Sequence, residues 1–280
     1  SIILGSHLQY AVDRSGLWSL DDVLDIENDS HFTNVLDPIP SFGFTDKPHW
    51  FRLVLKYEGE LEEVTKELEL AYPLLEFIDY YEINHEGVNR IVLGGKNRDL
   101  MGPDIKSRSF VVRIHLKRGE TKKIMIKVAG QAMLNLPYYL WDISARRQWD
   151  QTQMLVFGVY YGIIIVMFLY NLFLFLSMKF ISYFYYLCYI LSLGLFMLTN
   201  DGLIREYIVG NNQWINIHGF WTLMSTTGLT AILFFRQFLH IKIRHPNLDR
   251  VLRLIIGLYL SGLFLSFLDY SIFSNYITAV

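Results

Sequence analysis

The chain has 280 residues, of which 52% are hydrophobic and 19% charged, and its net charge is −2. Residues 1–153 carry 18 Lys and Arg against 23 Asp and Glu, whereas residues 154–280 carry 7 against 4. Neither part has the basic excess of a nucleic-acid-binding protein. The single cysteine, Cys188, excludes an intrachain disulfide and a cysteine metal cluster. Composition therefore predicts a mildly acidic, water-soluble first part and a membrane-embedded second part.

Residues 1–142 predict an all-β sandwich on the outer side of a membrane. Short runs rich in β-forming residues follow one another at regular spacing, each bounded by Gly, Pro, Asn or charged turns: "HWFRLVLKY", "ELELAY", "EFIDYYEIN", "RIVLGG", "SFVVRIHLK" and "KKIMIKVAG". This pattern is typical of an antiparallel sandwich. One short helix is predicted in "SLDDVLDI", with Ser19 as its N-cap.

Strand alternation predicts which side chains of the sandwich point inward, and six are chosen: Trp50, Leu53, Leu70, Ile78, Val111 and Ile126. A search for catalytic motifs finds no Gly-x-Ser-x-Gly, no His-Glu-x-x-His and no phosphate loop. His240 and His245 are five residues apart without further ligands, which favours ordinary loop histidines. The sequence predicts no catalytic residue, no metal site and no cofactor.

A connector at 143–153 leads from the sandwich into four apolar segments, predicted as transmembrane helices at 154–178, 182–198, 215–235 and 254–273. Each has about the 20 residues that a helix needs to cross a bilayer core. None has a polar face of useful width, which excludes a soluble all-α protein. We expect either that a signal peptide was removed before Ser1 or that the sequence was shortened there.

The loops predict the direction of the helices. The loop between the third and fourth segments carries five cations: Arg236, Lys242, Arg244, Arg250 and Arg253. The positive-inside rule places this loop in the cytoplasm, and counting back places residues 1–142 outside. Arg146 and Arg147 stand on the outer side against this rule, and we expect the five-cation loop to outweigh them.

Two polar residues stand out in the membrane part. Asn171 lies within the first apolar segment, and we expect its amide to bond to another helix, an interaction worth about 0.6 kcal/mol on average. The alternative is a packing contact without a signalling role. Asp269 is predicted near the outer surface. Few ionisable residues lie near the membrane centre, which argues against a transporter.

The order of several segments resembles the bacterial seven-transmembrane receptors with diverse intracellular signalling modules. The outer domain carries "DRSGLWSLDDVL", "FGFTDKPHWFRLVL", "LELAYPLLEFIDYY" and "LPYYLW". The membrane part carries "YYGIIIVMFLYNLFLFLSMKFISYFYYLCYI", "NDGLIREYI" and "FFRQFLHIKIRHPNLDRVLR". The resemblance implies a jelly-roll outer domain similar to carbohydrate-binding modules, and seven helices. It also implies a variable cytoplasmic output such as a histidine kinase, a diguanylate or adenylate cyclase, or a phosphatase.

The chain departs from that family in two ways. Only four spans and no output domain are present, so we expect it to be the N-terminal part of a longer receptor in a bacterial inner membrane. Lys127 stands where the family usually has an arginine. Three functions remain open: a sensor, a transporter or membrane-enzyme component with an accessory outer domain, and an adhesion module on a passive anchor. A homodimer through the bundle or through the output domain is a further expectation.

The sensor interpretation predicts a ligand site in the outer domain for a carbohydrate or a small metabolite. We expect a concave outer pocket lined by two cations and two aromatic side chains: Arg52, Arg108, Tyr139 and Trp141. Aromatic rings suit the apolar C–H faces of sugars, and guanidinium groups suit their hydroxyls. The alternative is that Arg52 and Arg108 are merely paired with surface acids, each pair being worth about 0–1 kcal/mol.

Overall fold

The computed structural model describes residues 1–26, 31–84, 87–98, 105–130, 133–210 and 212–277, with the side chains of residue 26 and of 265–277 left out. The chain divides into two compact units, Ser1–Gln151 and Thr152–Val280. The first unit is built of strands and the second of helices, so the break expected from composition is confirmed as a change of structural class.

The first unit is an antiparallel β-sandwich with one short helix, α1 (Leu20–Ile26). Its strands are β1 (Ile2–Ile3), β2 (Gln9–Val12), β3 (Thr33–Asn34), β4 (Ser41–Phe44), β5 (His49–Lys56), β6 (Glu63–Leu70), β7 (Phe77–Asn84), β8 (Gly87–Gly94), β9 (Phe110–Lys117), β10 (Thr121–Ala129), β11 (Met133–Asn135) and β12 (Tyr138–Asp142). The predicted cap of α1 is confirmed, because the Ser19 hydroxyl accepts from the amide of Asp22 at 3.2 Å.

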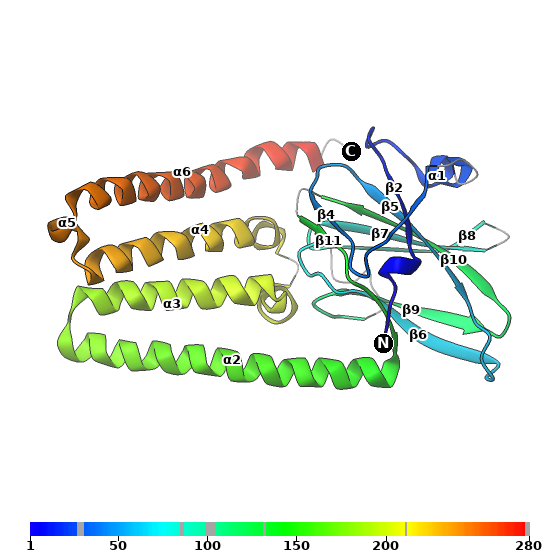
Figure 1. Cartoon of the computed structure of the whole chain (residues 1–280), viewed down its shortest axis with the longest axis horizontal. Coiled ribbons are helices and arrows are strands. Elements are labelled where there is room, and N and C mark those ends of the chain that lie inside the picture. Colours follow the sequence, from blue (N-terminus) through cyan, green and yellow to red (C-terminus); the bar gives the residue numbers. More distant parts are fainter. Residues whose placement is uncertain (27–30, 85–86, 99–104, 131–132, 211, 278–280) are drawn as a thin grey trace. The chain divides into compact units, whose positions relative to one another are not determined.

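The strands form two main sheets that face each other (Figure 1). One sheet has six strands in the order β3-β2-β5-β10-β7-β8, and the other has four in the order β1-β12-β6-β9. A two-stranded sheet pairs β11 with β4. Strands that are neighbours in a sheet are often distant in the chain, since β5 pairs with β10 and β12 pairs with β6. The all-β sandwich is confirmed, whereas the jelly-roll topology stays a prediction.

The main core lies between the two sheets and is filled by alternate residues of each long strand. Leu53, Leu70, Ile78 and Ile126 belong to it, as the alternation predicts. Trp50 and Val111 are buried but do not belong to it. Trp50 lies in a second cluster with Val23 and Met125, on the other face of the six-stranded sheet. The assignment of Trp50 and Val111 to the main core is therefore wrong.

The second unit consists of long helices joined by short turns: α2 (Ile143–Met178), α3 (Ile181–Asn200), α4 (Gln213–Phe238), α5 (Ile241–Arg244) and α6 (Pro246–Ile277). A π-helical turn, Ile204–Val209, follows α3. Each predicted span falls inside one of these helices. Among the described residues, α2 and α3 are long and apolar enough to cross a membrane. Four spans stay a prediction.

α3 packs against α4 and α4 against α6, and the short α5 turns the chain from α4 into α6 (Figure 1). Aromatic rings join α2 to α3 at Phe175 and Phe184, whose centroids are 5.6 Å apart. The hydroxyls of Ser192 and Thr230 lie 3.0 Å apart between α3 and α4. At the turn near α5, Arg236 of α4 donates to Asp249 of α6. The turns between α2 and α3 and between α4 and α6 therefore lie at the same end of the unit.

Candidate functional site

The outward face of the six-stranded sheet carries aromatic and cationic side chains in register. Two rows cross β2, β5, β10 and β7 in that order: Gln9, Arg52, Met125, Tyr81, and next to it Ala11, Trp50, Lys127, Asp79. Because β-strand side chains alternate between faces, all eight point away from the main core. We call this surface the candidate ligand face.

Arg52 lies at the centre of the candidate ligand face and is half-buried. Its Nε donates to Oε1 of Gln9 at 2.8 Å, and its Nη2 donates to the same oxygen. The guanidinium lies 4.7 Å from the ring centroid of Phe32. Burial lowers the pKa of Arg52 from its ordinary value, but an arginine remains charged at any physiological pH. The contacts of this cation thus include an amide oxygen and a ring.

The second row is an aromatic platform with a cation above it. The rings of Trp50 and Tyr81 stack with centroids 6.0 Å apart, and Nζ of Lys127 lies 5.2 Å from the Trp50 ring. Lys127 also donates to the main-chain oxygen of Trp18 at 3.3 Å. The indole Nε1 of Trp50 is buried without a hydrogen-bond partner in the described residues. A cation over an indole is worth about 0.5–1 kcal/mol at an exposed site and more when desolvated.

Asp13 holds the loop that brings Trp18 to this face. One oxygen of its fully buried carboxylate accepts from the amides of Ser15 and Gly16, at 3.0 and 2.7 Å. The other accepts from the amide of Trp18 at 2.9 Å. Burial raises the pKa of Asp13, but the bonds from Ser15, Trp18 and Gly16 outweigh burial and bring it below its ordinary value. The loop is therefore fixed by a charged acceptor.

The structure does not bring the four predicted site residues into one pocket. Arg52 is on the six-stranded sheet, whereas Tyr139 and Trp141 are on β12 of the four-stranded sheet. Their neighbours on β12, Tyr138 and Leu140, pack in or against the main core, so Tyr139 and Trp141 point outward. Arg108 lies just before β9, an edge strand of that second sheet. Ligand contact by any one of these residues stays a prediction.

The outward face of the four-stranded sheet instead receives the start of α2. Residues 143–151, most of the predicted connector, form the first turns of this helix and belong to the sandwich unit. Arg146 is buried there, with 5% of its side chain exposed, against Glu67 and Glu69 of β6, which are 3% and 7% exposed. Its nitrogens lie 3.5 Å from Glu67 and 3.9 Å from Glu69. We call these three residues the helix anchor.

Further contacts close the helix anchor from the sides. Arg146 Nη2 donates to the Ser107 hydroxyl at 3.0 Å, and Ser109 donates to Glu69. Arg146 also lies 3.4 Å from Asp150, one turn later in α2. The Trp141 ring stacks on Trp149 of the same helix at 6.2 Å. Sequence reasoning treated Arg146 as an exception to the positive-inside rule and missed this role, although the alternating "ELEL" of β6 places two carboxylates on one face.

Of the two polar residues predicted in the membrane, the structure describes the side chain of Asn171. Asn171 is buried, but its Nδ2 donates at 2.8 Å to the main-chain oxygen of Met167 in its own helix. The predicted bond to another helix is therefore wrong for this donor, because a carbonyl one turn earlier in α2 lies within its reach. The side chain of Asp269 lies outside the described residues.

Two family models cover nearly all of the chain. Residues 5–142 match the model described as 7TMR-DISM extracellular 2, and residues 153–280 match the model described as 7TM diverse intracellular signalling. The chain belongs to the 7TM receptors with diverse intracellular signalling modules. The 7TMR-DISM family implies a membrane protein with an extracellular N-terminal domain, and both matched domains are sensory rather than catalytic. No curated protein matches the chain.

In this 7TMR-DISM protein, the first matched region ends before Arg146 of the helix anchor and the second begins after it. The extracellular match ends at residue 142, where β12 ends, and the helical match begins at residue 153. Arg146 lies between them, in the part of α2 that folds with the sandwich. Among the described residues, no group of three His, Cys, Asp or Glu could hold a metal ion.

Proposed function

We propose that this protein is a bacterial inner-membrane receptor whose outer sandwich binds a ligand and whose first helix carries the signal toward the cytoplasm. The helix anchor is the observation that supports this most directly. β12 ends at Asp142 and α2 begins at Ile143, so the helix follows the last strand of the sandwich directly. The signal is passed to a cytoplasmic output module, in keeping with the intracellular signalling that the family description names.

The helix anchor makes this coupling mechanical. Glu67 and Glu69 belong to β6, which pairs with β12 on one side and β9 on the other. Any shift of β6 moves both carboxylates, and Arg146 follows because the removal of one partner from a buried ion pair costs about 3–5 kcal/mol. A movement within the sandwich is thereby transmitted to the first turns of α2, which continues to Met178.

The candidate ligand face suits a carbohydrate or a small polar metabolite. The half-buried ring of Tyr81, stacked on the buried Trp50, offers a flat surface, and the half-buried Lys127 offers a donor that bonds to a main-chain oxygen. Replacing a neutral acceptor with a ligand oxygen costs less free energy than replacing a carboxylate. The reason is that hydrogen bonds to charged groups are about twice as strong as those between neutral groups. Tyr139 and Trp141 belong to the face that receives α2, which favours Arg52 over them as a ligand contact.

The test is a glycan and metabolite screen on soluble residues 1–151, followed by three variants. Arg52→Ala is expected to weaken binding of any hit by about tenfold, equivalent to about 1.4 kcal/mol. Arg14→Ala removes an exposed arginine outside the candidate ligand face and serves as the matched control. Trp141→Ala, on the other sheet, is expected to leave the affinity unchanged. Unchanged binding by a folded Arg52→Ala variant would place the ligand elsewhere.

The proposed orientation has its own test. In a Cys188→Ser background, single cysteines replace Asn84 at the end of β7 and Asn247 at the start of α6. An impermeant maleimide added to cells with a permeabilised outer barrier is expected to label the first position and not the second. Equal labelling of both positions contradicts an extracytoplasmic sandwich.

A further inference from the structure

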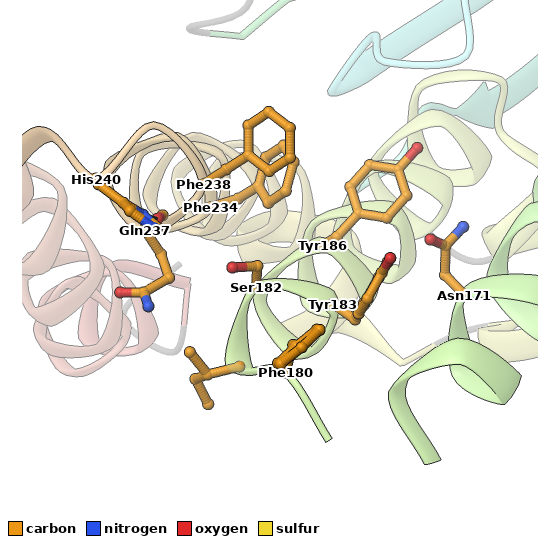
Figure 2. A pocket seen from close by; sticks show the side chains of 10 residues that line it. Asn171, Phe180, Ser182, Tyr183, Tyr186, Phe234, Gln237, Phe238 and His240 are labelled. Carbon is orange, nitrogen blue, oxygen red and sulfur yellow. Dashed lines mark hydrogen bonds between the residues drawn. The ribbon is translucent and has the colours of Figure 1, made fainter. Parts of the chain in front are cut away.

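A cavity of about 580 Å³ lies at the end of the helical unit where α2 turns into α3 and α4 ends (Figure 2). All of its lining residues belong to Thr152–Val280, so it shares no residue with the candidate ligand face or the helix anchor. Its walls combine aromatic rings, such as Phe180, Phe234 and Phe238, with polar side chains from three segments. This volume falls in the range of small-molecule sites, about 300–1,000 Å³.

The polar lining offers hydrogen-bonding groups at more than one position. Asn171 is buried, and its only described hydrogen bond runs from Nδ2 to Met167. Its Oδ1 is therefore left as an acceptor in the cavity wall. Figure 2 shows this amide toward one end with the hydroxyls of Tyr183 and Tyr186, and Gln237 and His240 toward the other. In an apolar surrounding such groups need a partner, since each unsatisfied one costs about 1–3 kcal/mol.

This end of the helical unit is strongly positive. Lys179 adjoins the cavity wall, and the turn around α5 carries the five cations that follow residue 235. The one acid of that turn, Asp249, is buried and accepts from Arg236 Nε at 2.5 Å and lies 3.2 Å from Arg253 Nε. Lys179, Lys242, Arg244 and Arg250 remain exposed. No carboxylate is among the described residues that line the cavity, so an anion meets no like charge there.

The surface beside the cavity is also apolar enough to lie in a membrane interface. Ile243 of α5 is 82% exposed, and it stands between the exposed cations Lys242 and Arg244. Exposed apolar side chains among basic ones are typical of segments that lie at the level of lipid headgroups. Basic clusters next to a spanning helix attract anionic lipids by about 1 kcal/mol for each cation near the surface.

We propose that this cavity binds one anionic phospholipid of the inner leaflet, its phosphate and glycerol oxygens facing the polar lining and an acyl chain lying along the phenylalanine rings. Tyrosine and serine hydroxyls and the glutamine amide donate to the lipid oxygens, and Asn171 Oδ1 accepts from a headgroup hydroxyl. The exposed cations supply the preference for a negative headgroup. The bound lipid thereby fills the space between the α2–α3 turn and the end of α4.

The test uses the 280-residue chain in neutral detergent, with phosphatidylglycerol or phosphatidylcholine of the same acyl chains added and bound lipid counted by native mass spectrometry. One phosphatidylglycerol per chain is expected, with phosphatidylcholine bound about tenfold more weakly. Ser182→Phe fills the cavity and is expected to lower bound phosphatidylglycerol by about tenfold, equivalent to about 1.4 kcal/mol. Ser177→Phe, on an exposed position of α2, is the matched control and is expected to retain the lipid.

A second variant keeps the cavity open and removes only its polar groups. Tyr183→Phe combined with Gln237→Leu is expected to reduce phosphatidylglycerol binding, whereas Tyr170→Phe, an exposed tyrosine outside the cavity, is expected to leave it unchanged. Equal binding of the two lipids, or full retention by both cavity variants, overturns the proposal. Displacement by inorganic phosphate alone would identify a soluble anion as the occupant and overturn the lipid assignment. Any of these results leaves the proposed sensor function standing.

Discussion

The two outward faces of the sandwich each hold a cation, in different surroundings. On the four-stranded sheet, Arg146 is buried against two carboxylates. On the six-stranded sheet, the half-buried Lys127 contacts a main-chain oxygen and the ring of Trp50. A buried ion cluster resists rearrangement, because opening it strands a charge. A cation that is bonded to a neutral acceptor exchanges its partner more easily than one in a buried ion cluster. The first arrangement suits a permanent attachment and the second suits a site that takes up and releases a ligand.

Removal of the anchor cation is expected to have the largest effect. Arg146→Met removes the buried cation shared by Glu67 and Glu69, of which Glu67 keeps its pair with Arg113 at 3.4 Å, and we expect the free energy of unfolding of residues 1–151 to fall by about 3–5 kcal/mol. Arg147→Met changes the exposed neighbour and is the matched control, with an expected effect within about 0.5 kcal/mol. Urea unfolding followed by circular dichroism measures both. Equal stability of the two variants would mean that the helix anchor does not hold α2 to the sandwich.

Trp50→Ala tests the other face by removing its platform. Trp50 is 1% exposed and packs with Val23 and Met125 beneath Tyr81 and Trp18. The cavity left behind is expected to cost about 3–5 kcal/mol, which would abolish soluble expression of a marginal domain. Phe44→Ala, at a ring that is 73% exposed, is the control. A stable Trp50→Ala domain would show that α1 and its flanking segments lie loosely on the sheet.

Asp13 makes the loop of the candidate ligand face dependent on pH. Its folded pKa is below the ordinary value of 3.8, so its contribution to stability is complete above about pH 4 and is lost as the pH falls through the folded pKa. Asp13→Asn is expected to cost about 1–2 kcal/mol at pH 7 and to flatten the stability profile below pH 4. Asp21→Asn, at an exposed position of α1, is the control. An unchanged acid profile in Asp13→Asn contradicts this role.

The smallest expected effect lies in the helical unit and contrasts with the anchor. Asn171 bonds to its own helix through a neutral amide, so Asn171→Leu is expected to cost about 0.6 kcal/mol or less. Ser177→Leu, exposed on the same helix, is the control. Unfolding of the chain in mixed micelles measures both variants. A loss near that of Arg146→Met would mean that Asn171 holds the helices together.

The sequence predicted the elements well and the faces less well. Alternation identified the long strands, and it placed Leu53 and Ile78 in the core because their strands are buried on that side. It misplaced Trp50 because α1 and nearby segments cover the outward face and bury residues there too. Burial on both faces removes the contrast on which the alternation argument depends.

The grouping of the candidate site failed for a different reason. Arg52 and Trp141 lie on different sheets because β5 pairs with β10 and β12 pairs with β6. Such a strand order cannot be predicted from local sequence patterns. The helix anchor unites residues that are 79 positions apart, Glu67 and Arg146. Such a contact becomes visible only when the register of β6 and the start of α2 are both known.

The same separation has a consequence for biosynthesis. A chain made and exported from its N-terminus delivers Glu67 and Glu69 across the membrane long before Arg146, so Glu69 waits for this cation, whereas Glu67 meets Arg113 earlier. β1 waits as well, because its described pairing is with β12. The outer domain can therefore reach its final fold only when the chain has emerged as far as the first turns of α2. Completion of the sandwich is thereby timed by the arrival of the first helix.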